Sequence, residues 1–131
     1  MKFFASASDR ERLEGFTHPR IRARIRSDLE AGRAARVPRI VLDVPLLLEN
    51  DDRHHLAQEC DALVFVDADD AVRDARAVSD RGWPSGEVSR RERTQMPLLA
   101  KRARAGYVVQ NQGSMADLMR QVDVVLQRLS P

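Results

Sequence analysis

Apolar residues follow two kinds of pattern along this chain, short continuous runs and runs spaced by three or four positions. The continuous runs lie at 40–42, within a predicted strand at 39–44, and at 62–66 and 107–109. Runs of this kind suit strands that are buried on both faces of a parallel sheet. Helical spacing separates them, and it is clearest at 118–129. Strands that alternate with helices predict an α/β fold, with a parallel sheet of about three strands flanked by helices.

The first run leads into an acid, Asp43, and a proline follows two positions after that acid. Pro45 cannot donate a hydrogen bond to a strand ladder, so the strand is expected to stop there. Asp43 is therefore predicted near the carboxyl end of a central strand, the edge at which open α/β sheets bind ligands. The alternative is that Asp43 only caps its own turn.

The residues before this run predict two helices. Asp9 can cap a short helix that reaches Phe16, and Pro19 is tolerated in the first turn of a second helix. The buried stripe of the second helix is expected to consist of Ile21, Ile25 and Leu29. Arginines cover its other faces, and their simplest interpretation is a solvated helix surface.

Later helix starts are recognisable by their caps. Asp69 and Ser85 each precede a helical pattern, and Pro97 restarts a helix. Ser114 and Asp117 form a capping-box-like start to the last helix. The sequence therefore predicts helices after each of the two later strands, with two further short helices between 85 and 105.

The net charge is only +2, so the distribution of charges along the chain is more informative than their sum. Nine acids stand against three arginines at 51–80, and seven basic residues stand against two acids at 81–104. The basic segment indicates a local anion site. A single cysteine, Cys60, excludes an internal disulfide and fits a reducing cytosol, and no apolar run has the length of a membrane span.

Metal and nucleic-acid sites are poorly supported. The adjacent His54 and His55 point to different faces of a helix, and no third donor has a suitable spacing to His55 and Glu59. No directly bound metal is therefore expected, and Cys60 is expected to be a small core residue. An arginine-rich RNA- or DNA-binding domain is a further reading, but there is only one tryptophan and one tyrosine, and acids balance the arginines.

The motif VLDVPLLLE at 41–49 closely resembles the "DVPLLFE" signature of dephospho-coenzyme A kinases. Further motifs agree in their order along the chain: His18-Pro19, Phe65-Val66-Asp67, Arg76, Arg81-Gly82-Trp83, Gln95-Met96-Pro97, Lys101 to Ala105, and Asn111-Gln112-Gly113. The similarity extends from about Phe4 to Leu129.

This resemblance implies a P-loop kinase fold in a single domain, 1–131, with a helical substrate-side segment at 4–38 and an arginine-rich, lid-like helical segment at 81–104. It implies a cytoplasmic enzyme of coenzyme A biosynthesis that transfers the γ-phosphoryl group of ATP, with Mg²⁺, to the 3′-hydroxyl of dephospho-coenzyme A. The partners implied are these two small molecules, with neither a nucleic acid nor a membrane.

The resemblance also implies roles for particular residues. Three residues are expected to serve catalysis: Asp43, Arg76 and Arg81. Asp43 would support Mg²⁺ through water. Arg76 and Arg81 would meet ATP phosphates from the base of the lid. Those expected to shape the substrate wall are His18, Pro19, Pro45, Leu46, Leu47 and Glu49. Those expected on the nucleotide side are Arg76, Asn111 and Gly113. Weaker lid candidates are Arg90, Arg91 and Arg93.

The chain departs from the family in one decisive respect. The phosphate-binding loop, Gly-x-x-x-x-Gly-Lys-Ser/Thr, is absent, because the only lysines are Lys2 and Lys101 and neither follows a glycine. The next segment, with the aspartate that the family uses on the acceptor hydroxyl, is absent as well. Gly106 stands where the family has an aspartate before its last strand. The chain is thus similar to the carboxyl-terminal two-thirds of such a kinase.

Two functional expectations follow. The first is an amino-terminally truncated dephospho-coenzyme A kinase that is inactive alone, and the second is a non-catalytic nucleotide- or coenzyme A-binding or interaction module derived from that kinase. In the family, another strand lies between those equivalent to 39–44 and 62–66. Without it, we expect a rearranged three-stranded sheet, or a chain that is marginally stable or self-associates.

Overall fold

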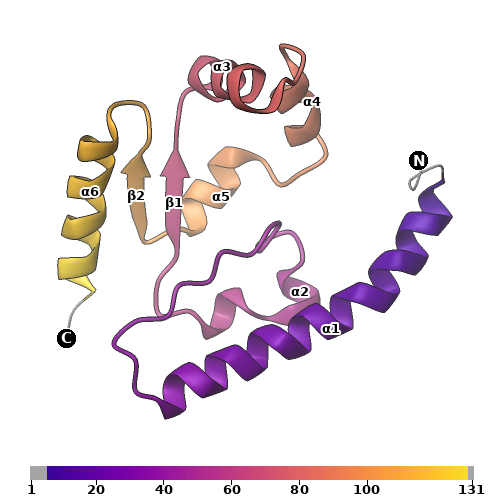
Figure 1. Ribbon diagram of the computed structural model, residues 1–131, viewed down its shortest axis with the longest axis vertical. Coiled ribbons are helices and arrows are strands. Elements are labelled where there is room, and N and C mark those ends of the chain that lie inside the picture. The colour runs from indigo at the N-terminus through magenta and orange to yellow at the C-terminus, as the bar shows by residue number, and fades with distance from the viewer. Residues whose placement is uncertain (1–5, 130–131) are drawn as a thin grey trace. The chain divides into compact units, whose positions relative to one another are not determined.

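The computed structural model describes residues 6–129, and the first residues of the predicted 4–38 segment lie outside this range. The chain divides into two compact units, Met1–Val44 and Pro45–Pro131. The boundary falls inside the VLDVPLLLE motif. Figure 1 shows the elements of both units, and the single domain stays a prediction. None of the helices in residues 6–129 combines the length and the apolar character that crossing a membrane requires.

The first unit contains one long helix, α1 (Ala7–Ala34), so the expectation of two helices with a break before Pro19 is wrong. Ser6, not Asp9, is its cap, and the Ser6 hydroxyl accepts the Asp9 N–H. A proline inside a helix removes one hydrogen bond. Two side chains bond to backbone carbonyls near this position: Thr17 donates to Leu13 at 2.9 Å, and Arg20 to Phe16 at 3.1 Å.

The segment after α1 returns along the helix without forming a strand. A Cβ on Gly32 would lie 2.7 Å from the Ile40 Cδ1, so the Ile40 side chain packs into the space that glycine leaves open on α1. Residues 39–44 are irregular, and Val41 is 85% exposed. The predicted buried strand at 39–44 is therefore wrong. An extended segment gains ladder hydrogen bonds only beside another strand, and no described strand pairs with this one.

The second unit contains a two-stranded parallel sheet, formed by β1 (Val64–Asp67) and β2 (Tyr107–Gln110). Val64 lies opposite Tyr107, and Asp67 lies opposite Gln110. Two of the predicted strands are thus confirmed in place and direction, whereas the sheet of about three strands is corrected to two among the described residues. Val109 in β2 is only 2% exposed and belongs to the core.

Helices flank this sheet, as predicted. They are α2 (Asp51–His54), the 3₁₀ helix η1 (Ala57–Glu59), α3 (Asp70–Arg81), α4 (Glu87–Glu92), α5 (Leu98–Arg104) and α6 (Met115–Arg128). The capping box of Ser114 and Asp117 is confirmed at the start of α6. Ser85 does not cap α4, because Gly86 occupies that position with φ +82°. In Figure 1, α6 runs beside β2, and α3 follows the carboxyl end of β1.

Candidate functional site

The residues expected to form one site are divided between the two units. His18 and Pro19 lie on α1, and Asp43 lies in the irregular segment that follows it. All the others belong to the second unit: Pro45, Leu46, Leu47, Glu49, Arg76, Arg81, Asn111 and Gly113. Asp43 is exposed and does not end a strand, because the strand at 39–44 does not form.

The turn at 45–50 holds one strained residue. Leu46 has φ +55°, a left-handed backbone conformation that is uncommon for residues other than glycine. Its carbonyl accepts the Asn50 N–H at 3.2 Å and the Asn50 side-chain amide at 3.3 Å. Arg36 and His55 share this conformation, and the role of Leu46 in the substrate wall stays a prediction.

Glu49 is bound by the segment that precedes and begins α5. Its Oε1 accepts from the Lys101 ammonium at 2.7 Å and from the Met96 N–H at 3.1 Å, and Lys101 also reaches the Gln95 side chain. Burial raises the Glu49 pKa, but the Lys101 hydrogen bond and charge and the backbone donors outweigh it and hold this pKa below its ordinary value. Glu49 therefore ties the turn at 45–50 to α5 as an ionised carboxylate.

Asp51 makes a second tie to α5, which the sequence interpretation missed. Its buried carboxylate accepts the Ala57 N–H at 2.9 Å, and Arg104 approaches its other oxygen at 3.4 Å. Burial raises the Asp51 pKa, whereas bonds from Ala57, Gln58 and Arg104 lower it, and the net shift is downward. In the sequence, Asp51 is one of two adjacent acids at the start of a helix, and nothing near it indicates a pairing with Arg104.

The carboxyl ends of β1 and β2 gather polar side chains. Asp67 ends β1, and its Oδ2 accepts from Arg102 of α5 and from the Gln110 side chain. The Asp67 carbonyl accepts the Asn111 N–H at 2.7 Å. Asp67 could have been found from the sequence, since it ends an apolar run as Asp43 does. This edge of the sheet is the place where open α/β folds bind ligands.

Two residues predicted on the nucleotide side meet at this edge. The Arg76 Nη1, from α3, donates to the Asn111 carbonyl at 2.9 Å. Gly113 follows in the same loop, where a Cβ would lie 3.1 Å from the Asp117 carboxylate of the capping box. The structure therefore brings Arg76 to the loop that holds Asn111 and Gly113.

The lid-like segment at 81–104 is organised around Trp83. The Arg91 guanidinium lies 4.1 Å from the centroid of the Trp83 ring, and the Arg81 guanidinium lies 5.1 Å from it. Glu87 accepts from Arg90 and Arg91, and these bonds lower the Glu87 pKa from 4.5 to about 2. Arg91 is thus held both by the Trp83 ring and by the Glu87 carboxylate, whereas Arg81 contacts the ring.

Two contacts attach the lid-like segment to α3. The Asp74 carboxylate accepts from the Ser85 hydroxyl at 2.6 Å and from the Gly86 N–H at 2.8 Å, and these bonds lower the Asp74 pKa. Arg73 pairs with Glu92 of α4. The helix that carries Arg76 therefore also holds both ends of α4.

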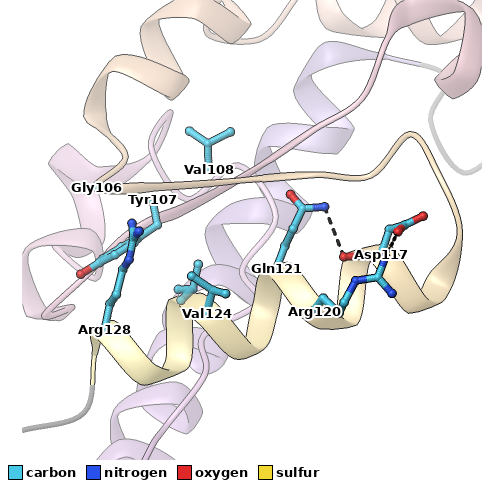
Figure 2. Close-up of a pocket in the computed structure, with 9 residues that line it drawn as sticks. Gly106, Tyr107, Val108, Asp117, Arg120, Gln121, Val124 and Arg128 are labelled. Carbon is cyan, nitrogen blue, oxygen red and sulfur yellow. Dashed lines mark hydrogen bonds and ion pairs between the residues drawn. The ribbon is translucent and has the colours of Figure 1, made fainter.

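A groove of about 440 Å³ lies between β2 and α6. Figure 2 shows Arg128 beside Tyr107 at one end and Arg120 with Asp117 at the other. The complete lining is Gly106, Tyr107, Val108, Asp117, Arg120, Gln121, Val124, Val125 and Arg128. The predicted site residues lie outside this lining.

Metal and thiol chemistry have little support from the arrangement. Within residues 6–129, no three His, Cys, Asp or Glu side chains lie close enough together to hold a metal ion. Burial, and then the charges of Asp61, Glu59 and Asp51, raise the pKa of the half-buried Cys60 thiol. A raised pKa leaves little reactive thiolate at neutral pH.

Comparison with known proteins gives one consistent family. The family model that matches residues 1–117 is described as dephospho-CoA kinase. The dephospho-CoA kinase of Corynebacterium jeikeium is 35% identical over 120 residues, which are 92% of this chain and 60% of that protein. That of Deinococcus radiodurans is 35% identical over 129 residues, covering 98% of this chain and 60% of that protein.

A solved structure agrees with this result. The crystal structure of TT1252 from Thermus thermophilus superposes with a TM-score of 0.72 at 31% sequence identity, covering 98% of this chain and 63% of that one. The chain spans about 60% of the length of the relatives that it matches. The likeness nonetheless extends across nearly all of these 131 residues, and the chain belongs to the dephospho-CoA kinase family.

Proposed function

We propose that this chain forms the acceptor-side, lid and adenine-side parts of an ATP-dependent kinase that phosphorylates the 3′-hydroxyl of dephospho-coenzyme A in coenzyme A biosynthesis. The family match over residues 1–117 is the observation that carries this proposal. In the reaction, the 3′-oxygen forms a bond to the γ-phosphorus, the bond from that phosphorus to ADP breaks, and the hydroxyl proton is lost.

The arrangement of the second unit supports a division of roles. Arg76, Asn111 and Gly113 would form the nucleotide side at the carboxyl edge of the sheet. Arg81, beside Trp83, would meet ATP phosphates when the lid closes, because a closed lid excludes water and strengthens charge stabilisation. A planar guanidinium suits this role, since it can make paired bonds to phosphate oxygens.

Each unit would contribute residues to acceptor binding. In the first unit these would be His18 and Pro19 of α1. In the second unit they would be Pro45, Leu46 and Leu47, with Glu49 holding the turn at 45–50 in place through Lys101. Catalysis here consists mainly of positioning, because the protein contributes little covalent chemistry to phosphoryl transfer.

Mg²⁺ would balance charge on the transferring phosphates when it is bound. The exposed Asp43 carboxylate could accept a hydrogen bond from a water ligand of that ion. In P-loop enzymes the direct protein ligand is the hydroxyl of the phosphate loop, and these 131 residues contain no such loop. The residues present therefore do not hold Mg²⁺ by themselves. Turnover would require a phosphate loop contributed by polypeptide outside these 131 residues.

The direct assay follows ADP release from ATP and dephospho-coenzyme A. The 131-residue chain would be measured alone and with an amino-terminal segment of the Corynebacterium jeikeium dephospho-CoA kinase, chosen to carry a phosphate loop. The matched control is the same segment with its loop lysine replaced by methionine. We expect no turnover by the chain alone, measurable turnover with the intact segment, and none with the control segment.

A second candidate is a non-catalytic nucleotide- or coenzyme A-binding module, which the missing phosphate loop favours. It would bind ATP or dephospho-coenzyme A weakly, and no added segment would produce ADP. Folded chain that gives no turnover with the intact segment, but still binds either ligand in a calorimetric titration, would replace the kinase proposal by this one. Turnover without any added segment would contradict both.

A further inference from the structure

The loop at 111–114 that joins β2 to α6 is fixed before any ligand arrives. At its start, the Asn111 N–H donates to the Asp67 carbonyl at 2.7 Å. At its end, Ser114 and Asp117 form a capping box. Both supports come from residues that adjoin the sheet or the loop itself. These bonds hold the two ends of the loop, and neither of them involves the Asn111 carbonyl, which needs a donor of its own.

Arg76 supplies that partner from a distant part of the second unit. It lies 35 positions before Asn111, and its Nη1 donates to the Asn111 carbonyl at 2.9 Å in a partly buried position. Asn111 is thereby held on both sides, by β1 through its N–H and by α3 through its carbonyl. A charged donor makes this bond stronger than an ordinary amide bond.

The same helix carries the contacts that hold the lid-like segment. Asp74, two positions before Arg76, accepts from Ser85 and Gly86, and Arg73 donates to the Ala68 carbonyl at 3.1 Å. α3 therefore joins the ends of both strands to the start of α4. Arg76 is the side chain through which this helix reaches the loop at 111–114.

We infer that Arg76 is a positioning residue, which sets nucleoside affinity by orienting the backbone of Asn111 rather than by touching ATP phosphates. This inference rests on the proposed function, because it assigns the loop at 111–114 to the nucleoside part of ATP. It differs from the expectation drawn from the sequence, in which Arg76 meets the phosphates. The two roles predict different losses when Arg76 is replaced. A phosphate contact acts on ATP alone, whereas an oriented loop acts on adenosine and ATP equally.

The first measurement needs no ligand. Amide hydrogen exchange of the 131-residue chain would be compared for the wild type, Arg76→Met, Arg76→Lys and the control Arg53→Met, which replaces an exposed arginine of α2. Arg76→Met should speed exchange at 111–113 by about tenfold and leave the Val109 amide, inside β2, unchanged. Arg76→Lys should restore part of the protection, because an ammonium can still donate to the carbonyl.

The second measurement titrates the same four proteins with adenosine and with ATP. We expect Arg76→Met to weaken both by a similar factor, about tenfold, so that the ratio of the two dissociation constants stays at the wild-type value. Arg53→Met should bind as the wild type does. A loss confined to ATP, with unchanged exchange at 111–113, would overturn the positioning role and assign Arg76 to the phosphates.

The two measurements separate this inference from the proposed function. If the wild type binds neither adenosine nor ATP, nucleotide binding by this chain is refuted, and the exchange data still decide whether Arg76 holds the loop. Unchanged exchange in Arg76→Met would overturn the inference whatever the binding result. If Arg76→Met loses protection throughout β2, the residue supports the fold, and the partial variant Arg76→Lys must then show a loss confined to 111–113 or the inference fails.

Discussion

Residues 39–44 and 107–110 both carry the apolar pattern of a buried strand, yet only the second forms one. β2 has β1 on one side, in parallel register from Tyr107 to Gln110. On its other side, the Gln121 side chain accepts the Gln110 N–H at 2.7 Å and donates to the Gln110 carbonyl at 2.9 Å. Residues 39–44 have no described strand beside them and remain irregular.

The difference shows that apolar pattern alone does not make a strand. A strand is stabilised by the hydrogen bonds of a neighbour, and an isolated extended segment leaves its polar groups to water. Val109 and Val41 illustrate this, because the first residue is 2% exposed and the second is 85% exposed. The same residue type belongs to the core in one segment and to the surface in the other.

The largest test places a charge at each valine. Val109→Asp would bury a carboxylate in the core of the second unit, and we expect a loss of more than about 4 kcal/mol in the free energy of unfolding. Val41→Asp should change it by less than about 0.5 kcal/mol. Chemical denaturation followed by circular dichroism gives both values. Equal losses would show that 39–44 is as well packed as β2.

The second test concerns Glu49, which follows the irregular segment at 39–44 and bonds with Lys101 and Met96. Glu49→Ala removes the carboxylate that Lys101 and the Met96 N–H share, and we expect a loss of about 2 kcal/mol at pH 7. Glu30→Ala, at an exposed position of α1, is the matched control and should have little effect.

This loss should depend on pH in a known direction. The Glu49 pKa is lower in the folded chain than its ordinary value of 4.5, so the ionised form is favoured by folding. The advantage of the wild type over Glu49→Ala should be complete above pH 4.5 and should disappear as the pH falls through the lowered pKa. A difference that stays constant down to pH 2 would contradict the ionised tie.

The smallest effect is expected at the outer edge of β2. Gln121→Ala removes a side chain that satisfies both the N–H and the carbonyl of Gln110, and we expect a loss of about 1 kcal/mol with faster exchange of the Gln110 amide. Gln127→Ala, exposed on the same helix, should leave both measurements unchanged. Unchanged exchange at Gln110 in the first variant would mean that β1 alone sustains β2.

In the candidate site, too, some residues were predicted from sequence motifs, whereas others became apparent only through their bonding partners in the structure. The sequence motifs led to Arg76, Asn111 and Gly113, and the structure brings Arg76 to the loop of the other two. Missed residues act across long separations in the chain, as Asp51 does with Arg104, 53 positions away, and as Asp67 does with Arg102. Their identity as acids was visible, but nothing local to them indicated their partners.

By itself, the sequence determined the family, the fold class, the two strands β1 and β2 and the capping box of α6, because these depend on motifs and on local hydrophobic period. Only the tertiary structure decided that α1 continues through Pro19, that 39–44 forms no strand and that Glu49 bonds with α5. For 39–44 and Glu49, the deciding free energy comes from a neighbour that is missing beside the segment or distant in the sequence. Local pattern specifies what a segment can form, and its neighbours decide whether it does.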